Sequence, residues 1–234
     1  MDINQKNIIY DKWLVFFSLS LFSILSASSL VGQKPIKIYF LVISSGTLLF
    51  SFAYWIVALI TILYGYKAAR NIINITTLCN FFIIGIIYFS LQLPNPEFWN
   101  DHEAYSLIMN KIIYISFIST VSYYVCEMLN ATILFYLCNK FYNVINLYYC
   151  VFISTSIAII LDTSFMIPVM LKSSQTTLLV IQKFISIIMS KLFFECCLIL
   201  LLPYLCYYII NNINAKNIKK CSSVFWLQEA LDGK

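Results

Sequence analysis

The chain has 234 residues, of which 61% are hydrophobic and only 11% are charged, and its formal net charge is +5. Soluble domains carry about 25% charged residues, so this composition excludes a soluble globular protein and predicts an all-α, polytopic membrane protein. No basic run with interleaved aromatic residues is present, so direct nucleic-acid binding is not expected and the positive excess indicates orientation in a membrane.

Six apolar stretches are long enough to cross a bilayer, which takes about 20 apolar residues per helix. The sequence predicts these six transmembrane helices at about 13–31, 47–64, 72–91, 112–138, 147–171 and 190–210. The first stretch is similar to a signal peptide, but its length and the spans that follow favour an uncleaved helix.

Two apolar segments do not fit a single span. The stretch before the second helix, IYFLVISSGT, contains Ser44, Ser45 and Gly46 and is expected to be an irregular lead-in. The stretch 176–211 would form a helix of about 54 Å, which exceeds a bilayer core of about 30 Å. We therefore expect a short interfacial or re-entrant piece at 177–189 before the last helix.

Six spans place both termini on the same side of the membrane. That side would carry most of the basic residues, among them Lys6, Lys12, Lys67, Arg70 and Lys140. The positive-inside rule then predicts that both termini are cytoplasmic. Residues 1–213 would form a single transmembrane domain, and 214–234 a polar cytoplasmic tail.

Two of the predicted helices carry a carboxylate near the middle of an apolar run, Glu127 in CEMLNATI and Asp162 in LDTSF. A carboxylate at the centre of a membrane helix costs about 2.5–3.5 kcal/mol on insertion scales. Such groups usually face a protein interior or a wet cavity. The sequence therefore predicts a polar site inside the membrane.

Tyr123, Glu127 and Asn130 share one helix face, because they are four and three residues apart. A carboxylate accepts N–H donors, an amide both donates and accepts, and an aromatic ring can stack, so this face suits a flat, hydrogen-bonding ring. The alternative is a polar clamp that holds two helices together.

Asp162 is followed by Thr163, and either a ligand or proton site or an ion pair with Lys191 would explain its position. Lys191 and Glu195 are four residues apart and can pair along their own helix. That pair would either neutralise both charges for insertion or contact a substrate.

The cysteine and histidine pattern predicts neither a metal site nor a cofactor. The eight Cys fall mostly in apolar segments without a CxxC pair, and the single His, His102, lies in a loop. No phosphate loop, nucleophile–base pair or protease signature is visible, so we do not expect an enzyme.

From Ser28 to Tyr204 the chain resembles the queuosine precursor transporter family, also called the vitamin uptake-like transporter family. The resemblance rests on the order and spacing of SSLVGQK, LLFSFAYW, LYGYKAAR, PEFWNDHEA, CEMLNATI and LDTSF, and on Lys191 and Glu195 before Pro203. It implies a six-helix importer in the bacterial inner membrane for 7-deazaguanine bases (preQ0, preQ1 or queuine) that feed tRNA modification. It also implies kinship with the substrate-binding subunits of energy-coupling-factor vitamin transporters.

By position, the resemblance implies that the polar intramembrane residues of the family correspond to Glu127, Asn130, Asp162, Thr163, Lys191 and Glu195. Three positions that are usually polar in the family are Ala58, Ile62 and Ile159 here, which implies a less polar site.

Three functions stay open at this stage. The first is a transporter that binds a small heterocyclic base between the fourth, fifth and sixth helices. The second is a substrate-capturing subunit that works with a separate energy-coupling ATPase. The third is a structural membrane protein whose ionisable residues only hold helices together. The lipid bilayer is the other expected partner, and a homo-oligomer stays open.

Overall fold

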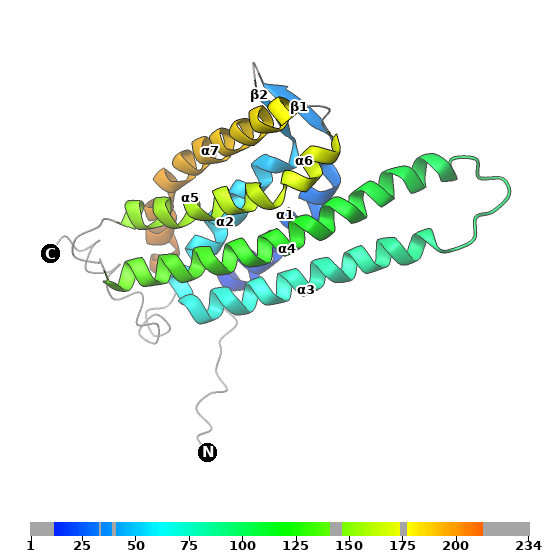
Figure 1. Ribbon diagram of the computed structural model, residues 1–234. Coiled ribbons are helices and arrows are strands. Elements are labelled where there is room, and N and C mark those ends of the chain that lie inside the picture. The colour runs from blue at the N-terminus through cyan, green and yellow to red at the C-terminus, as the bar shows by residue number, and fades with distance from the viewer. Residues whose placement is uncertain (1–11, 33, 39–40, 141–146, 174–176, 213–234) are drawn as a thin grey trace, which may run out of the picture.

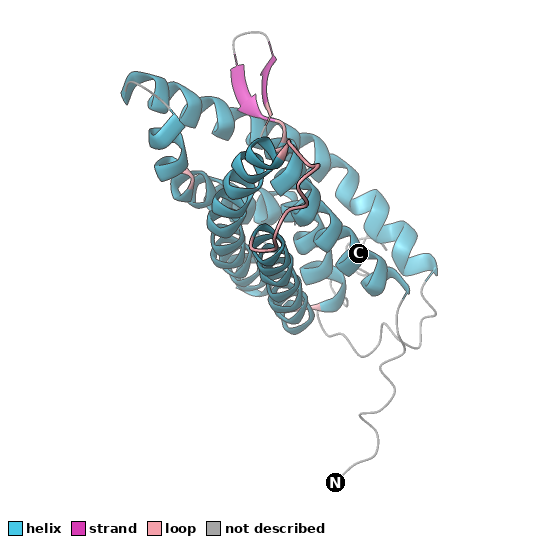
Figure 2. Cartoon of the chain, turned by 90° about the vertical axis from the view of Figure 1, so that its right-hand side faces the viewer, coloured by secondary structure: helices cyan, strands magenta, loops and turns pink. Residues whose placement is uncertain are grey.

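The computed structural model describes residues 12–32, 34–38, 41–140, 147–173 and 177–212. Its helices are α1 (Lys12–Val31), α2 (Gly46–Tyr64), α3 (Tyr66–Leu91), α4 (His102–Lys140), α5 (Leu147–Phe165), α6 (Ile167–Ser173) and α7 (Thr177–Asn212), and β1 (Pro35–Ile38) pairs antiparallel with β2 (Leu41–Ser44). Six helical segments are long and apolar enough to cross a membrane, which confirms the all-α, polytopic class (Figure 2). The predicted tail at 214–234 lies outside the described residues.

The central helix of the bundle is α2, which packs against α1, α3, α4 and α7 (Figure 1). In the apolar stretch of α2, 72% of the residues are buried, whereas the corresponding share in α1 is 28%. A helix that is apolar on all sides needs an apolar environment, which either lipid or neighbouring helices can supply. The run from Ala53 to Leu63 has that character, and nearly all of it is buried.

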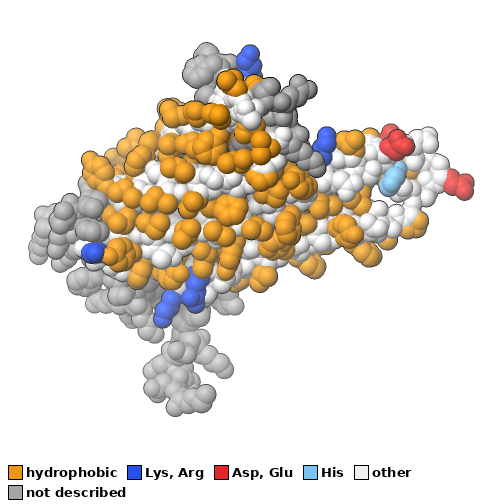
Figure 3. Space-filling view, viewed as in Figure 1, with side chains coloured by type: hydrophobic (Ala, Val, Ile, Leu, Met, Phe, Trp, Pro, Cys, Tyr) orange, Lys and Arg blue, Asp and Glu red, His pale blue; other side chains and the backbone are white. Residues whose placement is uncertain are grey.

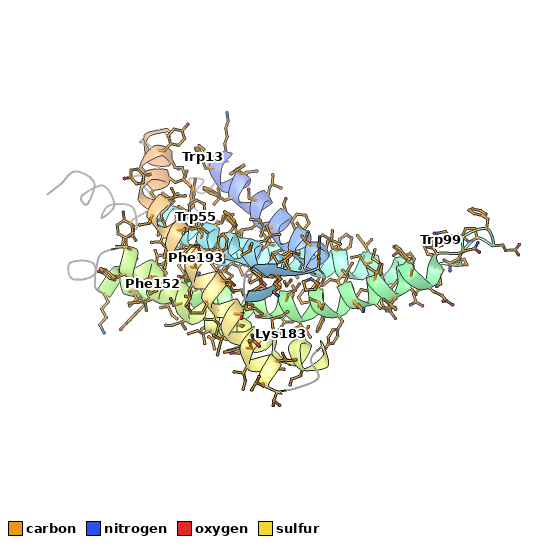
Figure 4. The ribbon with its side chains drawn as sticks, turned by 90° about the horizontal axis from the view of Figure 1, so that it is seen from above. Trp13, Trp55, Trp99, Phe152, Lys183 and Phe193 are labelled. Carbon is orange, nitrogen blue, oxygen red and sulfur yellow. The ribbon has the colours of Figure 1, made fainter. Side chains whose placement is uncertain are left out.

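Two ends of the bundle can be told apart. At one, which we call the terminal end, α1 begins and α7 finishes, and the rings of Trp13 and Tyr208 lie 6.1 Å apart (Figure 4). The chain also turns there from α2 into α3 at Gly65, whose φ of 83° suits glycine. The β1–β2 hairpin lies at the opposite end, which we call the hairpin end.

Helices α3 and α4 extend together beyond the rest of the bundle as a two-helix arm (Figure 1). Trp99 lies at its tip, with its ring 5.6 Å from that of Tyr105 (Figure 4). The acidic side chains of Glu97, Asp101 and Glu103 are exposed at this tip, away from the apolar surface of the bundle (Figure 3).

The expected break before the last helix is wrong. Residues 177–189 and 190–210 belong to one uninterrupted helix, α7, of 36 residues. Such a helix is about 54 Å long and fits a bilayer only if it tilts or extends beyond it. It runs obliquely to α3 and α4 in two perpendicular views (Figures 1 and 4).

The fifth predicted helix, expected at about 147–171, is instead interrupted at Met166. Pro168 has no N–H to donate to the carbonyl of Ser164, so α5 ends at Phe165 and α6 begins at Ile167. Within the expected irregular lead-in at 38–47, Leu41–Ser44 form the second strand of the hairpin, and α2 begins at Gly46. The Ser44 hydroxyl donates to the carbonyl of Gly32 at 2.7 Å.

Candidate functional site

The bundle encloses the ionisable residues that the sequence singles out. The exposed fractions of the predicted site residues are 0% for Glu127, Asn130, Thr163 and Glu195, 1% for Tyr123, and 3% for Asp162 and Lys191. Their helical spacing explains the burial on α4, where polar residues recur every three or four positions and so share the inner face. Their contacts place most of these residues in two layers of the bundle.

The first layer, which we call the ion-pair layer, joins α4, α5 and α7. The Lys191 ammonium lies 2.5 Å from Asp162 Oδ2, and the Ser122 hydroxyl donates to Asp162 Oδ1 at 2.5 Å. The Lys191 Nζ also lies 5.5 Å from the ring centroid of Phe50 and 5.9 Å from that of Tyr54, both on α2. Both charges of the pair therefore have partners, which a buried ion pair requires.

The pairing of Lys191 with Glu195 along one helix, which was one alternative for these residues, does not form. Lys191 bonds to Asp162, and both carboxyl oxygens of Glu195 are buried without a hydrogen-bond partner among the described residues. The alternative that the sequence offered for Asp162, an ion pair with Lys191, is the one that forms.

The second layer, which we call the acceptor layer, consists of Glu127, Asn130 and Glu195. It lies closer to the terminal end, because Glu195 is one turn beyond Lys191 on α7 and Glu127 is five residues beyond Ser122 on α4. Asn130 Nδ2 donates to Glu127 Oε2 at 3.2 Å. The Glu127 carboxyl is close enough to that of Glu195 to interact with it electrostatically.

Hydrogen-bond acceptors outnumber donors in the acceptor layer. Glu127 Oε1, Asn130 Oδ1 and both carboxyl oxygens of Glu195 are buried without a donor among the described residues. A buried polar group without its partner costs about 1–3 kcal/mol, and native proteins rarely keep several together. The layer is therefore built to receive hydrogen-bond donors.

The hydroxyls of two predicted site residues, Thr163 and Tyr123, contact groups outside the two layers. Thr163 donates to the Ile159 carbonyl of its own helix at 2.7 Å. The Tyr123 hydroxyl lies 3.4 Å from Thr76 Oγ1 on α3, and its ring belongs to the main apolar core. The structure therefore brings Glu127, Asn130, Asp162, Lys191 and Glu195 together, while Thr163 and Tyr123 only border them.

Sequence reasoning missed three residues of the site: Phe50, Tyr54 and Ser122. Phe50 and Tyr54 are four residues apart on α2, a spacing that also describes ordinary aromatic packing. The Tyr54 hydroxyl is buried close to the Asp162 carboxyl, although no hydrogen bond of full geometry forms between them. Ser122 directly precedes Tyr123, and nothing in its spacing indicates that it bonds to a residue 40 positions away.

The three apolar replacements named by the resemblance, Ala58, Ile62 and Ile159, are all buried. Ala58 is one turn beyond Tyr54 on α2 and is 0% exposed in the main apolar core. Ile159 is also 0% exposed and packs in one cluster with Tyr54 and Cys126. In the part of the chain that the structure describes, no three His, Cys, Asp or Glu side chains are grouped to hold a metal ion.

Residues 44–209 match a family model described as "Putative vitamin uptake transporter". No curated protein and no solved structure matches the chain. The matched range contains every residue of the ion-pair layer and the acceptor layer. With its six apolar helices, the chain is a multi-pass membrane transporter and belongs to the vitamin uptake transporter family.

Proposed function

We propose that this protein imports a queuosine precursor, a 7-deazaguanine base, across the bacterial inner membrane, and that the acceptor layer recognises the base. The observation that carries the proposal is the set of buried oxygens without donors on Glu127, Asn130 and Glu195. A 7-deazaguanine ring presents a ring N–H and an exocyclic amino group side by side, with a carbonyl next to them. It therefore supplies donors for the oxygens of the acceptor layer that have none.

The contacts of Glu127 and Asn130 suit this edge of the base. The Glu127 carboxylate can accept from both N–H groups, since each of its oxygens has more than one lone pair. Asn130 Nδ2, which is 3.2 Å from Glu127 Oε2, can turn to donate to the carbonyl of the base. A site built on such hydrogen bonds rejects a ring that lacks them, because its own buried groups would then stay unpaired.

The ion-pair layer has a different role in this proposal. Asp162 and Lys191 already bond to each other and to Ser122, so they hold α4, α5 and α7 together next to the substrate. In this proposal, the ion-pair layer holds helices together, as expected for ionisable residues with a structural role. The acceptor layer does not have that role.

Every member of both layers is at most 3% exposed, apart from Phe50. The substrate then reaches the acceptor layer only if helices move apart. The interruption at Met166, four residues beyond Asp162, is a place where α6 can move without unwinding α5. Opening there would expose the site to the hairpin end.

The test is the queuosine content of tRNA in a bacterium that lacks both precursor synthesis and its own importer, supplied with low preQ0, preQ1 or queuine in turn. We expect the native chain to restore queuosine and Glu127→Gln to abolish the restoration. Glu103→Gln, at the exposed tip of the arm, is the matched control and should behave as native. No restoration by a native chain that is shown to be folded in the membrane would refute the proposal.

Uptake of labelled preQ0, preQ1 or queuine can also be measured with the purified chain alone in liposomes. Uptake there would show that the chain transports by itself. Uptake in cells but not in liposomes, with retained binding, would instead indicate a substrate-capturing subunit that needs a separate ATPase.

A further inference from the structure

The buried charges of the described helices do not balance. Among the described residues, the buried charged side chains are Glu127, Asp162, Glu195 and Lys191, so the bundle encloses three carboxyl groups and one ammonium. Lys191 bonds to Asp162 at 2.5 Å. Two carboxyl groups, both 0% exposed, are left without a cation in the part of the chain that the structure describes.

Unpaired buried carboxylates are costly, so such a group takes up a proton or binds a cation or a hydrogen-bond donor. Glu127 has one such contact, from the neutral amide of Asn130. Among the described residues, Glu195 has none at either oxygen, although Lys191 is only one turn away on the same helix. The arrangement therefore directs the lysine away from the acceptor layer and leaves two carboxyl groups there without a cation.

We propose that the acceptor layer selects a substrate that carries a protonated amine, and that Glu195 is the residue that binds this ammonium group. The proposal rests on the proposed function and names the chemical class of substrate within it: a flat base with a cationic side arm. An ammonium group supplies both the positive charge and the N–H donors that Glu195 lacks.

The positions of the two carboxyl groups suit such a substrate. Glu127 and Asn130 lie on α4 and would hold the hydrogen-bonding edge of the ring. Glu195 lies on α7, close enough to Glu127 to interact with it electrostatically, and would hold the amine. Lys191 would not repel the incoming cation strongly, because its own charge is already compensated by Asp162.

The groups around Glu195 from the other helices do not provide an alternative partner. On α2, the buried residue one turn beyond Tyr54 is the apolar Ala58, whose side chain has no hydrogen-bond donor. On α5, Asp162 is committed to Lys191 and Ser122. The specificity for an amine thus depends on the chain's own Glu195.

The experiment compares two ligands that share one ring and differ in one substituent, 7-aminomethyl-7-deazaguanine and the neutral 7-cyano-7-deazaguanine. Their affinities for the purified native protein in detergent are measured by titration calorimetry. We expect the amine to bind at least about tenfold more tightly, since close charge pairs at binding sites couple this strongly. Equal affinities, or tighter binding of the nitrile, would overturn the proposal.

The variant Glu195→Gln tests the residue. It should reduce the affinity for the amine by roughly tenfold and leave that for the nitrile within about twofold, because only the amine meets the charge. Equal weakening of both ligands would overturn the assignment to Glu195. Glu103→Gln is again the control and should leave both affinities unchanged.

A further ligand allows the charge to be tested on the native protein, without relying on the folding of a variant. Acetylation of the aminomethyl group keeps the ring and removes the charge, so the acetylated compound should bind the native protein at least about tenfold more weakly than the amine. If the nitrile and the acetylated compound bind as well as the amine, this proposal fails while the proposed function stands. If none of the three ligands binds, both fail.

Discussion

Lys191 reaches from α7 to Asp162 on α5, where its ammonium lies 2.5 Å from Oδ2, although Glu195 is one turn away on its own helix. The contact therefore links two membrane helices instead of neutralising a charge within one. It also divides the buried carboxyl groups into one that is satisfied and two that are not. The candidate recognition site follows from this division.

The ion pair predicts an asymmetric response to substitution. Lys191→Met leaves Asp162 buried without its cation and should lower the free energy of unfolding by about 3–5 kcal/mol, measured by denaturant titration in mixed micelles. The double variant Lys191→Met, Asp162→Asn should recover much of that loss, because no charge is then left unpaired. The control is Lys111→Met, an exposed lysine on the arm, which should change stability little. A double variant as unstable as the single one would contradict this account.

Substitutions at Tyr54 can distinguish the contribution of its ring to stability from that of its hydroxyl. Its side chain is 1% exposed, and its hydroxyl lies near the Asp162 carboxyl but forms no hydrogen bond of full geometry among the described residues. Tyr54→Phe should therefore leave the melting temperature unchanged or raise it, since the substitution removes an unsatisfied group. Tyr54→Ala should cost about 3–5 kcal/mol, because it opens a cavity beside Lys191. A clear loss of stability in Tyr54→Phe would show that the hydroxyl is bonded.

Gly46 tests the close packing of α1 on α2, and Gly85 serves as the control position. A Cβ at Gly46 would lie 2.7 Å from the carbonyl oxygen of Ser28 and 3.0 Å from Gly32 Cα, whereas a Cβ at Gly85 would meet nothing within 4 Å. Gly46→Ala should lower the free energy of unfolding by about 1–3 kcal/mol through overpacking. Gly85→Ala should cause no loss, because alanine favours a helix more than glycine does. Equal effects at the two positions would argue against the close approach.

The hydrogen bond between Asn80 and Thr120 predicts a measurable coupling between α3 and α4. Asn80 Nδ2 donates to Thr120 Oγ1 at 2.5 Å, and both residues are buried. A double-mutant cycle with Asn80→Leu and Thr120→Val should give a coupling energy of about 0.6–1.7 kcal/mol, the range for hydrogen bonds between membrane helices. The unfolding transitions of the four proteins in micelles supply the measurement. Additive effects of the two substitutions would show that the bond contributes nothing.

The sequence predicted the features that depend on local chemistry. Apolar runs of about 20 residues have few alternatives to a membrane helix, so each of the six expected spans overlaps a long apolar helix, although some of the ends differ. The burial of Glu127, Asp162 and Glu195 was also predictable, because a carboxylate facing lipid would be too costly. The contact of Asn130 with Glu127 follows from their spacing, since residues three apart on a helix are neighbours. Pro168 carried a signal for the end of α5 that our interpretation of 147–171 as one helix overlooked.

Only the tertiary structure decided which helix faces which. The pairing of Lys191 with Asp162, and the approach of Ser122, Phe50 and Tyr54 to that pair, depend on how far each helix is rotated and shifted along its axis. The same freedom allows α7 to continue without a break, because a tilted helix can be longer than the bilayer is thick. Helical periodicity determines which residues share a face. It does not determine the neighbour of that face, because rotation and axial position are set by side-chain packing between segments far apart in the chain.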